Sequence, residues 1–287
     1  MLFTNRLNTE QLTAVKQLIK IVQQSDGTAR TPYLSNMLNF DHELPTFFLT
    51  YEGELLVGLL TVYADEPDDV ELAILVHPEF RRQGIATDLL NAFYRETADF
   101  SLAAPNFWTE RAFLDKHPDF PAQWNLVADE ETDIWLARER ESYLVKARTD
   151  VQVCQAEEAI LHAIARFQSQ TFDNDYQLSL RYAKEALQDE DSRLYVLLKE
   201  NQVIASCTVD LSSDYNYLYG LAVLENYRGQ GYGTYLVQEL VNELLSKNDK
   251  PFQIAVEDDN IGAKRLYEKI GFVQQTQIIY LKPAKEE

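Results

Sequence analysis

The chain has 287 residues, 46% of them hydrophobic, which is enough for about two domains that each bury a core. It carries 46 acidic and 26 basic residues, and the resulting net charge of −20 repels nucleic acids and anionic membranes and attracts cations. No apolar run approaches the roughly 18 residues of a transmembrane helix, and the N-terminus lacks the pattern of a signal peptide. We therefore expect a protein that binds neither nucleic acid nor membrane.

The cysteines and histidines indicate neither a disulfide framework nor a metal site. Two cysteines, Cys154 and Cys207, are too few for a disulfide scaffold, and a reducing cytoplasmic setting is expected. The histidines share no ligand spacing with each other or with the cysteines, so no metal is expected. The histidines are His42, His77, His117 and His162.

The first half of the chain begins with a helical pattern and continues with strand-like runs. Asn8 or Thr9 is expected to cap a helix that ends near residue 24. A turn at Arg81-Arg-Gln-Gly84 leads from the last of these strands into a second helix. The strands are expected at residues 46–50, 55–62 and 70–76.

A similar arrangement occurs in the second half, around residues 217–234. A strand-like run at 217–223 is followed by Arg228-x-x-Gly231-x-Gly233, which opens a helix. Glycines let the backbone approach a ligand closely, and the free amides at the start of a helix favour a phosphate. Taken alone, the pattern also fits an ordinary tight turn between a core strand and a core helix.

These two stretches belong to an internal repeat. Arg81 and Arg228 are 147 positions apart, and the same offset aligns Gly84 with Gly231. So long an offset indicates two whole domains rather than a solenoid. We expect a boundary between residues 140 and 141, giving domains 1–140 and 141–287. Strands at 133–138 and 277–282 are each expected to be the last strand of their own domain.

A further motif lies downstream in the second domain. After a predicted strand at 252–256, the chain reads Asn260-x-x-Ala263-x-x-x-Tyr267-x-x-x-Gly271-Phe272. Asn260 is expected to cap a short helix, and Gly271 to end it in the left-handed conformation. With the 228–233 motif in the right order and spacing, the second domain resembles the GNAT superfamily of acyl-CoA-dependent N-acetyltransferases. The first domain resembles a diverged copy.

The resemblance implies an α/β (α+β) fold with two tandem GNAT-like domains, each with a mixed, mostly antiparallel central sheet flanked by helices. It also implies acetyl-CoA as cosubstrate, with its pyrophosphate on the backbone amides of residues 229–234 and its pantetheine arm near Asn260. By similarity, Tyr267 protonates the departing CoA thiolate. The residues expected to bind acetyl-CoA in the second domain are Leu221, Ala222, Val223, Arg228, Gly229, Gln230, Gly231, Tyr232, Gly233, Thr234, Asn260 and Ala263.

The general base is left open by the sequence. Many relatives carry a glutamate where this chain has Tyr217, and this departure favours a base that acts through water. Strand alternation places Tyr217 and Tyr219 on one face, where they either line the acceptor pocket or simply pack in the sheet. Asp214 and Glu257 are acidic alternatives, although both are expected in solvated loops.

The first domain keeps the loop but has lost the downstream motif. Pro118 and Pro121 would break a helix there, and no tyrosine stands at the place of Tyr267. We therefore expect no catalysis in this domain, which either binds CoA or only supports the other one. Its candidate CoA-binding residues are Val76, Arg81, Arg82, Gln83, Gly84, Ile85, Ala86 and Thr87.

The expected function is transfer of acetyl from acetyl-CoA to a primary amine of a small molecule or peptide, by direct attack in a ternary complex. The negative charge favours a cationic amine as acceptor. The alternative is a non-catalytic acyl-CoA-binding sensor or scaffold. A monomer and a homodimer are both compatible with the sequence.

Overall fold

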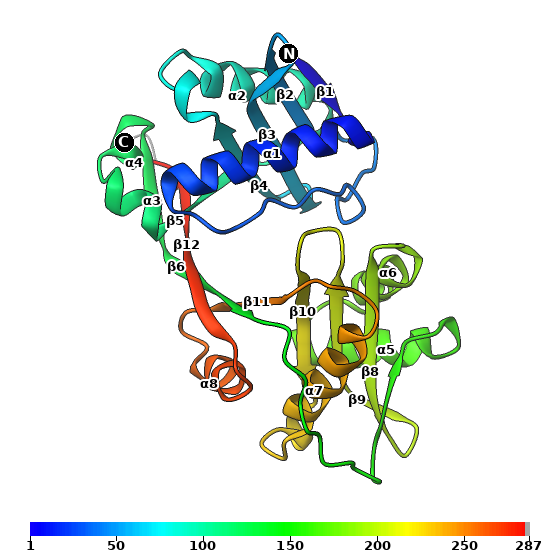
Figure 1. Cartoon of the computed structure of the whole chain (residues 1–287). Coiled ribbons are helices and arrows are strands. Elements are labelled where there is room, and N and C mark those ends of the chain that lie inside the picture. Colours follow the sequence, from blue (N-terminus) through cyan, green and yellow to red (C-terminus); the bar gives the residue numbers. More distant parts are fainter. Residues whose placement is uncertain (285–287) are drawn as a thin grey trace. The chain divides into compact units, whose positions relative to one another are not determined.

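The computed structural model describes residues 1–284, which divide into two compact units (Figure 1). Unit 1 contains Met1–Trp135 and the chain from Gln275 onward, and unit 2 contains Leu136–Gln274. Each unit has a mixed, mostly antiparallel sheet flanked by helices, so the predicted fold class is confirmed. The division lies a few residues before the predicted boundary at 140/141. The last strand of the chain lies in unit 1, whereas the sequence predicted it in the second domain.

The sheet of unit 1 consists of seven strands within the described residues. β1 to β4 form an antiparallel meander, β5 is parallel to β4, and β12 is antiparallel to β5. In spatial order the strands are β1 (Leu2–Thr4), β2 (Phe47–Glu52), β3 (Leu55–Glu66), β4 (Asp69–Val76), β5 (Asn106–Glu110), β12 (Val273–Pro283) and β6 (Leu126–Arg138).

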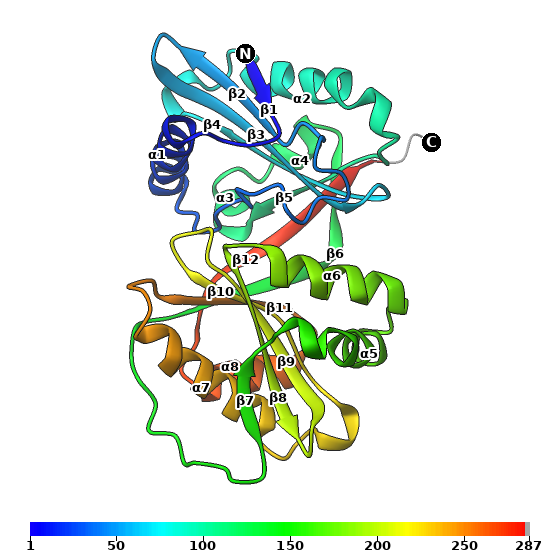
Figure 2. The same ribbon diagram turned by 90° about the vertical axis from the view of Figure 1, so that its right-hand side faces the viewer.

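Helices α1 (Thr9–Asp26) and α2 (Ile85–Glu96) cover opposite faces of this sheet (Figure 2). The predicted cap of α1 is confirmed at Asn8, which forms a reciprocal capping box with Gln11. Two short helices, α3 (Arg111–Lys116) and α4 (Phe120–Gln123), follow β5. They replace the single helix of the other unit, in agreement with the helix-breaking prolines.

β12 lies between β5 and β6 because its side chains make apolar contacts on one side and polar contacts on the other. Ile279 and Leu281 are buried against Leu114 of α3. On the other side, the Tyr280 hydroxyl donates to Asp133 Oδ2 at 2.6 Å, and Lys282 Nζ lies 2.7 Å from Asp129 Oδ2. The prediction that this strand completes the second domain was therefore wrong: β12 completes the sheet of unit 1.

Gly58 lets α2 begin close to the sheet, and an added methyl group has no room. A Cβ built at Gly58 would lie 2.5 Å from Ile85 Cγ2 and 3.1 Å from Leu89 Cδ1. We therefore expect Gly58→Ala to lower the free energy of unfolding of unit 1 by about 1–3 kcal/mol through overpacking. Urea unfolding followed by tryptophan emission measures this loss, since Trp108, Trp124 and Trp135 all lie in unit 1.

The control is Gly53→Asn, in the turn between β2 and β3 of unit 1, where no atom lies within 4 Å of an added Cβ and asparagine tolerates the φ of +61°. It should change the free energy of unfolding of unit 1 by less than about 0.5 kcal/mol. Equal stabilities of Gly58→Ala and the parent protein would contradict the packing argument.

Unit 2 repeats the plan. Helices α7 and α8 lie on one face of its sheet, and α5 and α6 on the other (Figure 2). Its strands are β11 (Phe252–Glu257), β10 (Asn216–Val223), β9 (Gln202–Asp210), β8 (Ser192–Lys199) and β7 (Gln152–Gln155) in spatial order. Its helices are α5 (Leu161–Phe172), α6 (Tyr176–Gln188), α7 (Tyr232–Leu245) and α8 (Ile261–Lys269).

The predicted repeat holds at the level of the elements. β4 (Asp69–Val76) and β10 (Asn216–Val223) are offset by 147 positions at both ends, as are the 3-10 turns Pro78–Phe80 and Glu225–Tyr227 that follow them. The helices α2 and α7 also begin 147 positions apart. Within residues 1–284, no helix is long and apolar enough to cross a membrane.

Candidate active site

The first element of the candidate site in unit 2 is a divergence of two parallel strands. β10 pairs with β11 only from Asn216 to Leu218, and the rest of β10 has no partner in β11. On its other side, Tyr219 is opposite Thr208 and Ala222 is opposite Ser206, so Gly220 and Leu221 together face one residue of β9. Gly220 has φ +58°, which a β-bulge of this kind requires. The bulge frees backbone groups of β10 for a ligand.

The second element is the loop that follows β10. Gly229 and Gly231 both have positive φ, and α7 begins directly after Gly231. The backbone amides of residues 229–234 donate to no group within residues 1–284. Arg228 Nε donates to Val223 O at 3.0 Å and ties the loop to the end of the strand. Free amides at a helix N-terminus form a site for an anionic group such as a pyrophosphate.

Further cations surround this loop. Arg148 Nη1 donates to Gln230 O at 3.0 Å, and its guanidinium lies 4.1 Å from the centre of the Tyr232 ring. Lys199 Nζ donates to the Tyr232 hydroxyl at 2.9 Å. Asp150 accepts from both cations, which lower the pKa of its carboxyl. The sequence reasoning missed Arg148 and Lys199 because they approach the loop from distant segments.

The third element is α8. The Asn260 side chain accepts from Ala263 N at 3.1 Å, and Gly271 has φ +86°, so the predicted cap and stop are both confirmed. The cap uses Asn260 Oδ1 and leaves its Nδ2 group as a donor for a ligand carbonyl. Gly233 allows α7 to approach α8 closely, since a Cβ there would lie 3.3 Å from Leu266 Cδ1.

Tyr267 is the one candidate acid among these residues. It is 6% exposed, and its hydroxyl makes no hydrogen bond within the described part of the chain. Burial raises its pKa above the usual value, and the nearby Cys207 and Tyr217 raise it further. Cys207 lies opposite the bulge, so the phenol is close to the divergence of β10 and β11. Tyr267 therefore stays protonated at neutral pH and is able to donate a proton there.

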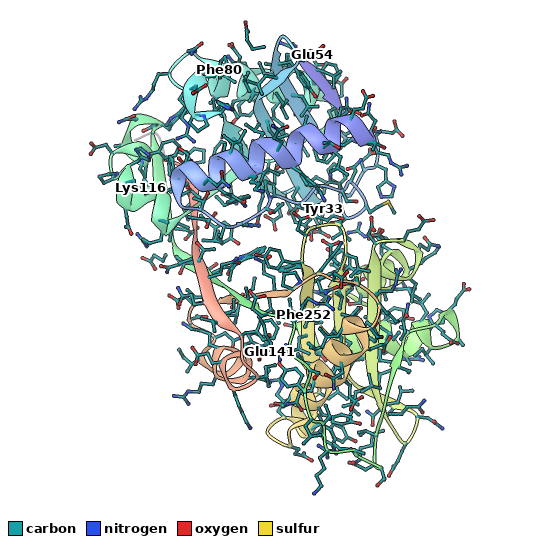
Figure 3. The ribbon with its side chains drawn as sticks, in the orientation of Figure 1. Tyr33, Glu54, Phe80, Lys116, Glu141 and Phe252 are labelled. Carbon is teal, nitrogen blue, oxygen red and sulfur yellow. The ribbon has the colours of Figure 1, made fainter. Side chains whose placement is uncertain are left out.

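Unit 1 contains a cavity of about 750 Å³ at the corresponding place. β4 pairs with β5 only at Glu71 and Leu72, and the cavity is lined by the two strands where they diverge. Phe80 and Lys116, both labelled in Figure 3, line it as well. All the candidate residues of unit 1 line the cavity except Gln83, whose side chain donates to Glu79 O. No local pattern in the sequence indicated the size of this cavity.

The loop of unit 1 has the same features as the loop of unit 2, but unit 1 has no tyrosine at the position of Tyr267. The amides of residues 82–87 have no hydrogen-bond partner within residues 1–284, and Arg81 Nε donates to Val76 O at 3.1 Å. Arg81 also forms a bidentate pair with the buried Asp26, at 2.8 and 2.7 Å. At an offset of 147, Tyr267 corresponds to Phe120, which lines the cavity and has no proton to give. Unit 1 thus has a cavity and free loop amides but lacks this acid.

Within residues 1–284, no three His, Cys, Asp or Glu side chains are grouped so as to hold a metal ion.

Tyr217 and Tyr219, the candidate residues of the acceptor pocket, stack on each other, with ring centres 6.0 Å apart and an interplanar angle of 14°. Asp214 and Glu257 are both exposed, as expected, but Glu257 is the last residue of β11 rather than a loop residue.

Comparison with known proteins identifies the family. The model of the acetyltransferase (GNAT) family matches residues 13–111 and 159–272, once in each half of the chain. A 76-residue stretch is 34% identical to the ribosomal protein bS18-alanine N-acetyltransferase of Haemophilus influenzae, which corresponds to 26% of this chain and 51% of that protein. The chain thus spans about half the length of this curated relative.

Solved structures resemble the whole chain at low identity. A GCN5-related N-acetyltransferase from Sphaerobacter thermophilus superposes with a TM-score of 0.71 and 14% identity over 98% of this chain and 95% of that one. A tandem GNAT protein from the clavulanic acid biosynthesis pathway gives a TM-score of 0.67 and 15% identity, covering 100% and 99%. At these identities the likeness concerns the fold alone.

Proposed function

The chain belongs to the acetyltransferase (GNAT) family, and from this premise we propose that unit 2 transfers acetyl from acetyl-CoA to a primary amine. The pyrophosphate binds the free amides of residues 229–234, and the pantetheine arm follows β10 toward the bulge as an added strand would. A β10 amide freed by the bulge polarises the thioester carbonyl. The amine attacks directly in a ternary complex, and Tyr267 protonates the leaving thiolate.

The observation that carries this proposal is the buried phenol of Tyr267 beside the bulge, which has no hydrogen-bond partner within residues 1–284. A non-catalytic binding site has no need for a proton donor at this position. Thiol release from acetyl-CoA over a panel of primary amines tests the proposal. Tight binding of CoA without turnover on any amine would overturn it in favour of a sensor or scaffold.

The acceptor is a cationic amine in this proposal, because the net charge of −20 attracts cations. The curated relative acts on an alanine of a ribosomal protein, so a peptide that begins with alanine belongs in the panel. The unpaired thiols of Cys154 and Cys207 fit a reducing compartment, and we place the enzyme in the cytoplasm, as a monomer or a homodimer.

For unit 1 we propose binding of CoA without chemistry, which its cavity and free amides favour. A matched pair of substitutions separates the two loops: Gly84→Asp and Gly231→Asp, both at positive φ, where aspartate is tolerated. Each places a carboxylate against the pyrophosphate and is expected to weaken CoA binding at its own loop by about 30-fold or more. Isothermal titration should then count two CoA sites in the parent protein and one in each variant.

Turnover should depend on the loop of unit 2 alone. At low acetyl-CoA concentration it should be lost in Gly231→Asp and kept in Gly84→Asp. A single CoA site in the parent protein that disappears in Gly231→Asp would show that unit 1 does not bind CoA. Loss of turnover in Gly84→Asp, with CoA still bound at unit 2, would contradict the division of roles.

A further inference from the structure

The side chains of β9 alternate between the two faces of the sheet in unit 2, so Cys207 and Asp210 lie on opposite faces. The Tyr195 hydroxyl donates to Glu243 of α7, so Tyr195 marks the face covered by that helix. Cys207 is opposite Tyr195 and shares that face. Because side chains alternate along a strand, Asp210 points to the other face, toward α5 and α6.

Asp210 lies beside the two stacked tyrosines on this face. In the antiparallel ladder it is directly opposite Tyr217, and Thr208 is opposite Tyr219. Directly opposed residues have Cβ atoms about 5 Å apart and share a face. Tyr217 is in turn close enough to Tyr267 to raise its pKa. Asp210 and Tyr267 therefore both lie near Tyr217, with Asp210 on the face that α5 and α6 cover.

Asp210 forms no ion pair within the described residues. Its oxygens accept from the amide and the hydroxyl of Ser212, at 2.8 and 2.9 Å, and no cation lies against it. Burial raises the pKa of its carboxyl, and Asp189 and Asp191 at the end of α6 raise it further, whereas the Ser212 bonds lower it. The groups on the neighbouring strands are Ser192 of β8 and the tyrosines of β10. A carboxylate without a cation is suited to bind an ammonium group.

The internal repeat gives an independent comparison. At an offset of 147, Asp210 corresponds to Tyr63 of unit 1, just as Tyr267 corresponds to Phe120. The unit that lacks the phenol thus also lacks the carboxylate. The acidic alternatives of unit 2, Asp214 and Glu257, are both exposed.

We propose that Asp210 binds the acceptor's ammonium group and takes its proton, an assignment that rests on the acetyl transfer proposed above. The ammonium gives one proton to the Asp210 carboxylate, directly or through one water, and becomes a free amine. The amine nitrogen then forms a bond to the thioester carbon, and the carbon–sulfur bond breaks. Tyr267 gives its proton to the sulfur and regains one from the nitrogen, and Asp210 releases its proton to solvent.

The test compares Asp210→Asn with the parent protein, using acetyl-CoA with putrescine, spermine and a tetrapeptide amide that begins with alanine. Asparagine keeps the shape and an acceptor for Ser212 but removes the charge and the base. The value of kcat/KM at pH 7.5 should fall by about 100-fold or more, with the CoA dissociation constant within about twofold. Activity of the variant should rise with pH as the amine loses its proton in solution, which a purely structural role would not produce.

The matched control is Asp191→Asn, which removes an exposed carboxylate of the same neighbourhood and should change kcat/KM by less than about threefold. An Asp210→Asn variant within about threefold of the parent protein, with an ordinary pH profile, overturns the assignment while leaving acetyl transfer intact. If the parent protein turns over none of the amines, the proposed function fails, and the Asp210 assignment is judged by binding. The tightest amine must then bind the CoA-loaded Asp210→Asn variant at least about tenfold more weakly, and equal or absent binding in both proteins overturns it.

Discussion

Replacing Tyr267 by phenylalanine is expected to lower kcat by about 100- to 1,000-fold while the dissociation constant of CoA stays within about twofold. The substitution removes a hydroxyl that makes no hydrogen bond within residues 1–284, so no structural partner is lost. The ring contact with Phe272, at 6.3 Å between centres, is retained. What disappears is the proton donor beside the bulge, and the thiolate must then leave unprotonated.

Thiol release under saturating acetyl-CoA and amine measures kcat, and isothermal titration measures CoA binding. Burial raises the pKa of Tyr267 above the ordinary tyrosine value of 10.0, so the phenol stays protonated up to at least pH 10. Loss of this acid therefore should not limit turnover of the parent protein below about pH 10.

Tyr195→Phe is the matched control. It also removes a buried hydroxyl of unit 2, one that donates to Glu243 at 3.0 Å. It should cost about 0.5–1.5 kcal/mol of stability and leave kcat within about twofold. Unchanged turnover in Tyr267→Phe, or an equal loss in both variants, would remove Tyr267 from its role as acid.

The parts of the site that follow one another in sequence were predictable. The strand, glycine loop and helix at 217–234 are governed by local rules: apolar alternation, positive φ at Gly231 and free amides at the start of a helix. The same holds for α8, since Asn260 and Gly271 fix its ends through the backbone. The offset of 147 then predicted the corresponding strand, loop and helix of unit 1, but not a counterpart of α8, which two short helices replace there.

Features that depend on contacts between distant segments were not predictable. Asp210 lies opposite Tyr217 only because of the register of β9 against β10, and no local sequence pattern specifies that register. The cavity of unit 1 is lined by α1, α3, α4 and the diverging ends of β4 and β5, which are far apart in the sequence. The placement of β12 was wrong because both final strands have suitable apolar patterns, and only the contacts of Ile279 and Leu281 with α3 decide between the sheets.

The position of β12 leads to the second large effect: Ile279→Asp should unfold unit 1. Ile279 is 1% exposed, and it packs with Leu281 against Leu114. Burying such side chains stabilises a fold by about 1.5–3 kcal/mol each, and an unpaired carboxylate at this place adds a desolvation cost of several kcal/mol. The total approaches the 5–15 kcal/mol that is typical of a whole domain, so few molecules should keep the sheet.

Tryptophan emission isolates this effect, because all three tryptophans lie in unit 1. The emission of Ile279→Asp should shift to the red of the parent protein under native conditions, and its urea transition for unit 1 should be lost. Val273→Asp is the matched control, since Val273 begins the same strand but is 70% exposed, and surface substitutions usually change stability by less than about 0.5 kcal/mol. Native emission and an unchanged urea midpoint in Ile279→Asp would mean that unit 1 forms its sheet without β12. Deleting the chain from Gln275 onward separates the two causes, because loss of β12 alone should produce the same red shift without introducing a buried charge.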